Sequence, residues 1–350
     1  MIRIGINGFG RIGTTLTRIC LLQKDCQVVM INDLEPNAEQ FRYLLKYDSH
    51  IGSLENEVSC VDGGLVVDGK RIEIEGRAEI QDVPWEKAKV DIIIDASGVL
   101  KNLKAAKQML RAGRVQKIIV THQSDKEGLV DKIIIPGINE HEYQEDKHHL
   151  LSASICDAHG LAHILRHLNG LYGINSGFVT TLHPWLSYQR LLDGRVASVE
   201  NPTHFWSDFS LGRASSGAII PKNTTAASAV MEVLPELQGK LKAHSYRVPT
   251  SVVCTADMTL SLQKNVSKED LIRGIEKWAG TSKYVVSERD YKISVDYRKL
   301  EASCSVDLKF VEVLGGGMVK VVVWYDNEWG YSCRVLDLAR IALPRLLAVS

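Results

Sequence analysis

A cysteine and an aspartate stand side by side in LLSASICDAHGLAHILRHLNGL, residues 150–171. After them, leucine and isoleucine recur with helical spacing, at positions 161, 164, 165, 168 and 171. The pattern predicts a helix that begins at Cys156. The macrodipole and unpaired N–H groups of a helix N-terminus favour a thiolate, so we expect Cys156 to be a nucleophile rather than a small core residue.

Three glycines near the N-terminus have the spacing of a dinucleotide-binding turn. The segment GFGRIG, residues 8–13, follows an expected strand over residues 2–7 and opens an expected helix. Asp33 lies 20 residues beyond the last glycine, after a second expected strand over residues 27–31. A carboxylate there accepts hydrogen bonds from the ribose hydroxyls and repels a 2′-phosphate, because both are negatively charged. The expected cofactor is therefore NAD rather than NADP.

The elements around these residues alternate in the order of a doubly wound sheet. Further strands are expected over residues 90–95, 117–121, 132–136 and 150–152, with a helix over 103–112. Ser97, Gly98 and Thr121 follow or end strands and would lie at the carboxyl edge of the sheet, where ligands bind. The predicted fold class is α/β, with a Rossmann-type NAD-binding domain over residues 1–155.

The composition excludes several classes of protein. The 350 residues are 45% hydrophobic, which suits an ordinary globular chain with two cores, and 42 basic residues balance 42 acidic ones, so no nucleic acid is expected as a partner. Apolar runs such as residues 318–325 are far shorter than the roughly 20 residues that cross a bilayer, and no membrane is expected. Seven cysteines without a CxxC pair indicate reduced thiols in the cytoplasm, and no metal site is expected.

Four motifs resemble the phosphorylating glyceraldehyde-3-phosphate dehydrogenase family. They are INGFGRIG at residues 6–13, LLKYDS at 44–49, RVPT at 247–250 and WYDNEWGYS at 324–332, and the similarity runs from end to end. The resemblance implies an α+β catalytic domain with a mixed sheet beneath helices over residues 156–331. It also implies a homotetramer and a C-terminal helix, expected over residues 336–347, that packs back on the Rossmann domain within residues 332–350.

The resemblance also assigns roles to single residues. Cys156 matches the nucleophile, and His183 matches the general base that takes the hemithioacetal proton while hydride leaves for the nicotinamide. Asn327 matches the residue that holds the nicotinamide carboxamide. The resemblance implies cofactor contacts for Gly10, Arg11, Ile12, Asp33, Arg77, Thr121 and Asn327, with Tyr331 close by, and the glycine turn and strand ends add Gly8, Gly13, Ser97 and Gly98. Substrate contacts are expected from Thr224 and Arg247, which match the family, and from Asp157 and Thr225, which depart from it.

The chain departs from the family where phosphate is handled. Ser-Cys-Thr-Thr-Asn is replaced by ICDAH at residues 155–159, which removes hydroxyls expected to bind the attacking phosphate. An ionised Asp157 at about 4 Å opposes a phosphate by roughly 4 kcal/mol per unit charge at an effective dielectric near 20. It also raises the pKa of Cys156, unless it is engaged as a helix N-cap. Leu186 and Leu211 replace a threonine and an arginine, so phosphate is expected to be a poor co-substrate.

The segment over residues 190–212 is longer than the corresponding loop of the family. Pro202, the aromatic residues and the mixed charges of this segment indicate an ordered loop, although a neutral surface elaboration is an open alternative. Positive charge could return to the phosphate pocket from Arg195, His204, Arg213 or Lys222.

These features predict an NAD-dependent dehydrogenase that oxidises an aldehyde through a thioester on Cys156, with glyceraldehyde 3-phosphate as the first candidate. One alternative is an aldehyde with a different or missing phosphate, its thioester released to water or another acceptor, as in the similar erythrose-4-phosphate dehydrogenases. Another is a regulatory protein that keeps NAD binding and the tetramer with little activity. The joint presence of Cys156, His183 and Asn327 disfavours the regulatory alternative.

Overall fold

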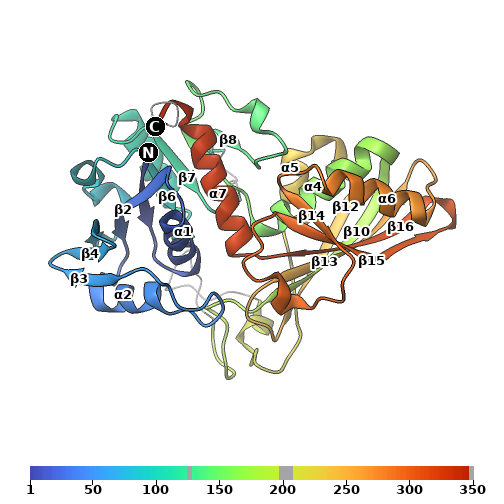
Figure 1. Ribbon diagram of the computed structural model, residues 1–350, viewed down its shortest axis with the longest axis horizontal. Helices are drawn as coiled ribbons and strands as arrows, with labels where there is room; N and C mark the ends of the chain where they lie inside the picture. Colours follow the sequence, from blue (N-terminus) through green and yellow to red (C-terminus); the bar gives the residue numbers. More distant parts are fainter. Residues whose placement is uncertain (124–127, 197–207, 347–350) are drawn as a thin grey trace. The chain divides into compact units, whose positions relative to one another are not determined.

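The computed structural model describes residues 1–123, 128–196 and 208–346, and the chain divides into two compact units. One unit consists of Met1–Ser154 together with Ser332–Ser350, and the other consists of Ile155–Tyr331. Figure 1 shows the elements of each unit. Cys156 is therefore the second residue of the second unit. In the described part of the chain, no helix has the length and apolar character needed to cross a membrane.

The first unit is built on a mainly parallel sheet. Among its described residues the strand order is β3-β4-β5-β2-β1-β6-β7-β9-β8, and all neighbours from β5 to β8 pair in parallel. The strands are β1 (Ile2–Asn7), β2 (Cys26–Asn32), β3 (Val58–Val61), β4 (Gly64–Val67), β5 (Lys70–Glu75), β6 (Ile92–Asp95), β7 (Lys117–Val120), β8 (Lys132–Ile133) and β9 (Leu150–Ser152). Helices α1 (Arg11–Leu21), α2 (Ala38–Lys46) and α3 (Asn102–Arg111) connect them. The strands run outward from β1 in both directions, which confirms the predicted Rossmann-type fold.

The C-terminal helix α7 runs over Trp329–Ala342, so the predicted start at residue 336 is wrong. The carboxylate of Asp326 accepts from the backbone N–H of Glu328 at 2.9 Å and of Trp329 at 2.8 Å, which supplies acceptors for donors that an α-helix leaves unpaired at its first turn. Hydrophobic spacing marks only the part of a helix that faces a core. The helix therefore begins just after its capping residue, about two turns before that pattern becomes clear.

The second unit contains a mixed sheet with the order β11-β12-β10-β13-β16-β15-β14 among its described residues. The pairs β10–β12 and β14–β15 are parallel, and the other neighbours are antiparallel. The strands are β10 (Ile174–Pro184), β11 (Ile220–Lys222), β12 (Leu241–Val248), β13 (Cys254–Leu262), β14 (Val285–Glu288), β15 (Cys304–Leu314) and β16 (Met318–Tyr325). Helices α4 (Cys156–Tyr172), α5 (Ala226–Val233) and α6 (Lys268–Ala279) lie on one side of this sheet (Figure 1), as the predicted mixed-sheet domain requires.

Strand β16 separates two environments because successive side chains of a strand point to opposite faces. Val321, Val323 and Tyr325 are buried, whereas Lys320 is exposed. A Cβ placed on Gly160 of α4 would come within 2.7 Å of the Tyr325 ring, so the helix and the ring are in close contact. Tyr325 therefore lies on the helix-covered face, and its neighbour Trp324 lies on the opposite face.

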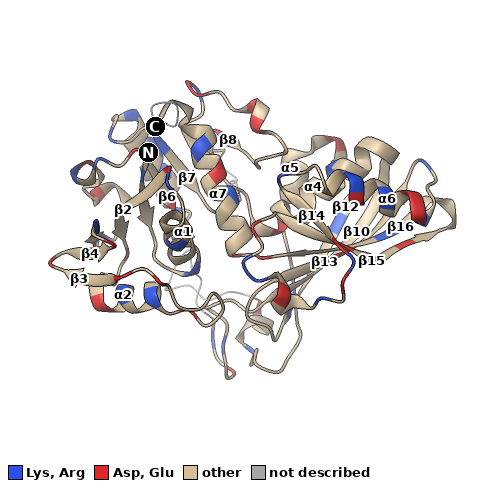
Figure 2. Cartoon of the chain, in the orientation of Figure 1, with Lys and Arg blue, Asp and Glu red and all other residues tan. Residues whose placement is uncertain are grey.

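Charged residues are interspersed along both units (Figure 2), as the equal numbers of basic and acidic residues suggest. One cation has a structural task in the first unit. The guanidinium of Arg340 on α7 bonds both carboxylate oxygens of Asp25, at 2.7 and 3.1 Å, and so attaches this helix to the start of β2. The pair is partly shielded from solvent, which gives it more weight than an exposed ion pair.

Candidate active site

Cys156 is the first residue of α4, as its sequence context predicts. Ile155 occupies the N-cap position in an extended conformation and has no side-chain cap. Just before it, Ser154 adopts a left-handed backbone with φ of 56°, and its N–H donates to the Ser152 hydroxyl at 2.9 Å. A left-handed conformation is costly for a residue with a Cβ, so its presence here shows that the surrounding structure holds the approach to Cys156 in one geometry.

His183 lies near the end of β10 and faces the thiol. Its Nε2 atom is 3.8 Å from the Cys156 Sγ atom, although the two residues are 27 positions apart. Its Nδ1 atom is 2.8 Å from the carbonyl oxygen of Pro184, which can only accept, so Nδ1 carries the proton. In the neutral ring, the lone pair of Nε2 is consequently available to the thiol.

Burial sets the charge of both groups. It raises the pKa of the Cys156 thiol, and the neighbouring Asp157 carboxylate raises it further. Burial also lowers the pKa of His183 to about 4, with Arg247 as the next contribution. Desolvation therefore outweighs the effect of the helix N-terminus on Cys156, and the two pKa shifts together favour a thiol and a neutral imidazole at neutral pH.

Asp157 is the second residue of α4 and does not act as its N-cap, a position that Ile155 occupies. Its Oδ1 atom accepts a hydrogen bond from the Tyr325 hydroxyl at 2.6 Å and lies 4.0 Å from the Cys156 Sγ atom. The side chain is buried. Sequence reasoning missed Tyr325 as this partner. The alternation of buried residues along residues 319–325 is the signal that could have placed it on the covered face.

Two cations adjoin this cluster. Arg247 of β12 is paired in register with His183 of β10 and is only 5% exposed. Its Nη1 atom donates to the Pro184 carbonyl at 3.3 Å, and its Nε atom has no hydrogen-bond partner among the described residues. Lys222 belongs to the neighbouring strand β11, and burial followed by the charge of Arg247 lowers its pKa to about 8. A buried donor that lacks a partner is a candidate contact for a ligand.

The other predicted substrate residues lie at the start of α5. Thr224 accepts from the backbone N–H of Ala226 at 3.1 Å, and Thr225 is the N-cap residue. Leu211 is fully buried, so no polar group replaces the family arginine at that position. Of the proposed replacement cations, Lys222 lies near the cluster, whereas His204 is outside the described residues, as are residues 197–207 of the longer loop.

The glycine turn of the first unit fits a dinucleotide. Gly8 has φ of 94°, and a Cβ there would meet the Ser97 backbone at 2.8 Å. A Cβ on Gly13 would meet the Gly8 carbonyl oxygen at 2.1 Å, whereas the space beside Gly10 is open. Gly10 is also the N-cap of α1 and offers no side-chain cap, so no cap side chain competes with a pyrophosphate for the first N–H groups of that helix.

The remaining cofactor residues of this unit gather at the carboxyl ends of its strands. Asp33 accepts from the Phe9 N–H at 2.7 Å, which joins the end of β2 to the glycine turn. Asp95, at the end of β6, accepts from the Ser97 hydroxyl at 2.6 Å, and its carbonyl accepts from Thr121. The backbone N–H of Arg77, another predicted contact, donates to the Asn32 side chain, and Gly98 has a positive φ. Arg11 forms an ion pair with Asp48, and Ile12 lies in the first turn of α1.

Asn327 and Tyr331 belong to the second unit. The amide oxygen of Asn327 accepts from the Val253 N–H at 3.0 Å, so its NH₂ group is the part that it can offer to a carboxamide. Val253 has φ of 72°, a rare conformation for a β-branched residue, and this bond helps to hold it. The Tyr331 ring meets the His159 ring edge-on, with centroids 5.3 Å apart.

Comparisons with known proteins give the same family for both parts of the chain. The model described as "Glyceraldehyde 3-phosphate dehydrogenase, NAD binding domain" matches residues 2–103, and the one described as "Glyceraldehyde 3-phosphate dehydrogenase, C-terminal domain" matches residues 155–327. A cytosolic glyceraldehyde-3-phosphate dehydrogenase of Chlamydomonas reinhardtii is 37% identical over 340 residues, covering 97% of this chain and 96% of the relative. The Geobacillus stearothermophilus enzyme of that name is 37% identical, with 97% of each chain covered. Glyceraldehyde-3-phosphate dehydrogenase 2 of Trichormus variabilis is 36% identical, with 99% of each covered.

Proposed function

The chain belongs to the glyceraldehyde-3-phosphate dehydrogenase family, and from this premise we propose that it oxidises glyceraldehyde 3-phosphate and passes the acyl group to inorganic phosphate. Membership makes it an NAD-dependent oxidoreductase that acts on an aldehyde. The relatives favour this activity over a different aldehyde or a regulatory role. The observation that carries the proposal is the 3.8 Å approach of the Cys156 Sγ atom to the unprotonated Nε2 atom of His183.

The first step needs His183 as a base because the thiol is protonated at rest. Nε2 takes the thiol proton as sulfur adds to the aldehyde carbon, and it then returns this proton to the former carbonyl oxygen, which gives a neutral hemithioacetal and a neutral imidazole. Bound NAD supplies the hydride acceptor for the oxidation that follows. His183 then accepts the hydroxyl proton of the hemithioacetal, which leaves a thioester on Cys156. Its Nδ1 bond to Pro184 keeps the ring in the required tautomer throughout.

The substrate phosphate is assigned to Arg247 and Lys222. The unpaired Nε atom of Arg247 is a buried donor, and charge-assisted hydrogen bonds to phosphate are stronger than neutral ones. Lys222 contributes a second positive charge from the adjacent strand β11. These cations supply the binding energy that the replacement of the family arginine by Leu211 removes.

The attacking phosphate meets a less favourable site. The Asp157 carboxylate lies 4.0 Å from the Cys156 Sγ atom, and its hydrogen bond to Tyr325 holds it there. We propose that this charge weakens the binding of inorganic phosphate, so the thioester forms faster than it is released. Restoring the family residue with Asp157→Thr removes the charge and returns a hydroxyl.

Rapid mixing with glyceraldehyde 3-phosphate and NAD tests the proposal. We expect a burst of NADH close to one per chain, then a slow steady state whose dependence on phosphate steepens in Asp157→Thr. NADP should give no comparable burst, since Asp33 opposes a 2′-phosphate. Cys156→Ser should abolish the burst and still bind NAD. A full burst in Cys156→Ser, or no burst with this aldehyde in the unaltered protein, contradicts the proposal.

The family also suggests an assembly and a location. We propose a homotetramer in the cytoplasm, following the cytosolic relative for the location. Sedimentation should give a mass four times the 38.9 kDa of the chain. A monomeric mass at micromolar concentration contradicts the tetramer.

A further inference from the structure

Three side chains of different chemical type converge at the N-terminus of α4. A thiol, a carboxylate and an imidazole each offer one ligand atom, and the three atoms lie within 4.8 Å of one another. They belong to Cys156, Asp157 and His183. Sulfur, nitrogen and oxygen donors together are the set that zinc takes in proteins.

The spacing of the donors suits a tetrahedral ion. Bonds of about 2.0–2.3 Å at the tetrahedral angle place neighbouring donors about 3.4–3.7 Å apart. The Cys156 Sγ atom lies 3.8 Å from His183 Nε2 and 4.0 Å from Asp157 Oδ1. The two separations from sulfur therefore need to close by only a few tenths of an ångström, and the His183 and Asp157 ligand atoms, which lie within 4.8 Å of each other, need to approach by at most about 1.4 Å to complete three corners of a tetrahedron. Water or a substrate atom can fill the fourth corner.

The hydrogen bonds around the donors orient them as ligands. The Nδ1–H group of His183 donates a hydrogen bond to the Pro184 carbonyl oxygen. This bond orients the ring so that the Nε2 lone pair is directed toward the ligand atoms of Cys156 and Asp157. The Tyr325 hydroxyl holds the Asp157 carboxylate. Ligating imidazoles and carboxylates in metal sites have partners of these kinds, which fix the tautomer and the ring orientation.

Charge makes Asp157 decisive. A thiolate and a carboxylate neutralise a divalent cation, whereas a thiolate alone leaves one positive charge in a buried site. Arg247 is buried beside His183, so an uncompensated charge would be repelled. The resemblance places threonine at position 157 in the family, and this chain therefore has an anionic ligand that its relatives lack at this position.

We propose that Cys156, Asp157 and His183 form a zinc site that holds the protein in a reversibly inhibited state. On binding, the Cys156 thiol loses its proton to solvent and its sulfur bonds the metal, with no change of oxidation state. The metal then occupies the lone pairs of both the nucleophile and the base. The inhibition rests on the proposed function, whereas the binding does not.

Zinc and cobalt titrations of the full chain after treatment with a chelator test the site. Calorimetry should show one tight zinc per chain, and cobalt should give a thiolate charge-transfer band with the visible absorption of a tetrahedral ion. Asp157→Thr should weaken zinc binding by about 100-fold, since even outer partners of metal ligands contribute 10–100-fold. Cys156→Ser should abolish the charge-transfer band. Tyr325→Phe should weaken binding by about tenfold.

Cys60→Ser is the matched control, because Cys60 is a free thiol near the carboxylate of Glu39 in the first unit. It should bind both metals as the unaltered protein does, and circular dichroism should confirm that each variant is folded. Equal zinc affinity in Asp157→Thr, or loss of the cobalt band in Cys60→Ser, overturns the site. Tight zinc binding without loss of aldehyde oxidation supports the site and overturns Cys156 as the nucleophile, so the two failures are distinguishable.

Discussion

Two buried aspartates on opposite faces of the second sheet have different surroundings. Trp324 and Tyr325 are consecutive in β16, and each donates to one of them. The Trp324 indole donates to Asp307 at 3.2 Å, and the Tyr325 hydroxyl donates to Asp157 at 2.6 Å. Asp307 is fully buried, and Asp157 is 7% exposed. The same strand therefore supports one carboxylate on each face, by the alternation of its side chains.

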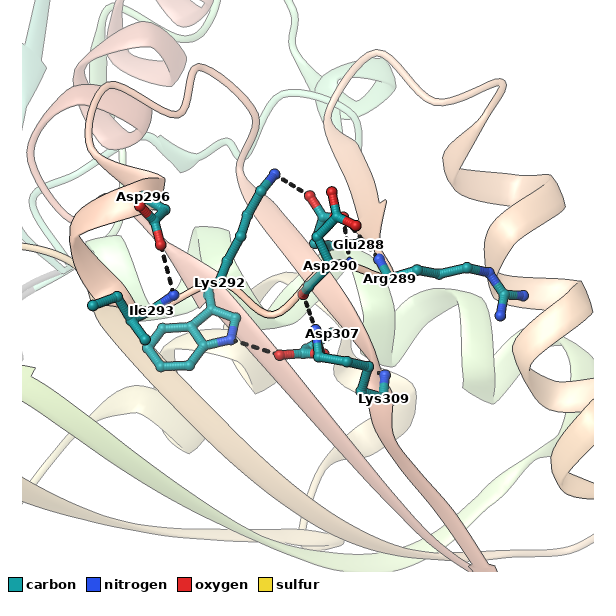
Figure 3. Close-up of polar contacts among 9 residues, drawn as sticks. Glu288, Arg289, Asp290, Lys292, Ile293, Asp296, Asp307 and Lys309 are labelled. Atoms are coloured by element: carbon teal, nitrogen blue, oxygen red, sulfur yellow. Dashed lines mark hydrogen bonds and ion pairs between the residues drawn. The ribbon is translucent and has the colours of Figure 1, made fainter.

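The partners of Asp307 make it structural. The Lys309 ammonium lies 3.3 Å from its carboxylate, and the Lys309 N–H also donates to it. Figure 3 shows Asp307 and Lys309 beside the ion pair of Lys292 with Glu288. The Lys309 ammonium also donates a hydrogen bond to the Asp290 carbonyl oxygen. Asp307 is thus neutralised by a cation and held by two further donors. Such a network stabilises the segment that follows β14.

Asp157 is held by a neutral hydroxyl and lies beside a thiol. Its charge therefore raises the pKa of Cys156, and we propose that it also acts on incoming phosphate and on metal ions. Burial by itself therefore does not identify a functional carboxylate. The Asp307 carboxylate faces the Lys309 ammonium, which neutralises it, whereas the Asp157 carboxylate faces the reactive thiol of Cys156.

The largest effect is expected from His183→Gln on the helix-covered face. Loss of the base should lower kcat by about 10²–10⁴-fold. The fraction of folded protein at 25 °C should be unchanged, since glutamine can still donate a hydrogen bond. Steady-state kinetics and urea unfolding check both points. Activity within threefold of the unaltered protein would remove His183 from the mechanism.

Asp307→Ala should act on stability instead. It leaves the Trp324 indole without its acceptor and the partly buried Lys309 without its carboxylate. Removing one partner of a buried pair costs about 3–5 kcal/mol of the free energy of unfolding. Urea unfolding measures this loss, and the kcat per folded molecule should stay constant. If Asp307→Ala lowered the activity without lowering the stability, the structural role assigned to Asp307 would be wrong.

The pH dependence of KM sharpens the assignment of Lys222. Burial lowers its pKa to about 8, so the ammonium is charged below this pH and loses its proton above it. A phosphate ester has its second pKa near 6 and is already dianionic at pH 7. The KM for glyceraldehyde 3-phosphate should therefore rise by about tenfold between pH 7 and 9, the value of one charged hydrogen bond. Unphosphorylated glyceraldehyde and the Lys222→Met variant provide controls, and both should lack this rise.

The smallest effects come from Trp324→Phe and Tyr325→Phe, which remove one hydrogen bond each. Each should cost about 1 kcal/mol of stability. Only Tyr325→Phe should alter the rate at which iodoacetamide labels Cys156, because Asp157 is then free to move relative to the thiol. An equal change in labelling rate for both variants would show that the two faces are not independent.

Much of the site could be predicted from the sequence, where the signal is local. The strand, glycine turn and helix over residues 2–21 follow from spacing, since close backbone approach admits only glycine at Gly8 and Gly13. The helix that begins at Cys156 follows from its hydrophobic period. The beginning of α7 was harder to predict, because the cap formed by Asp326 precedes the periodic part of the helix.

The sequence by itself determined the local elements, the fingerprint for NAD and the family, because each is written in residues that are close along the chain or in motifs of fixed spacing. Only the tertiary structure decided that Tyr325 reaches Asp157 across 168 positions and that Arg247 is in register with His183. It also decided that burial raises the pKa of Cys156. The reason is that desolvation and pairing depend on which strands are neighbours, and sheet order is set by the packing of the whole unit.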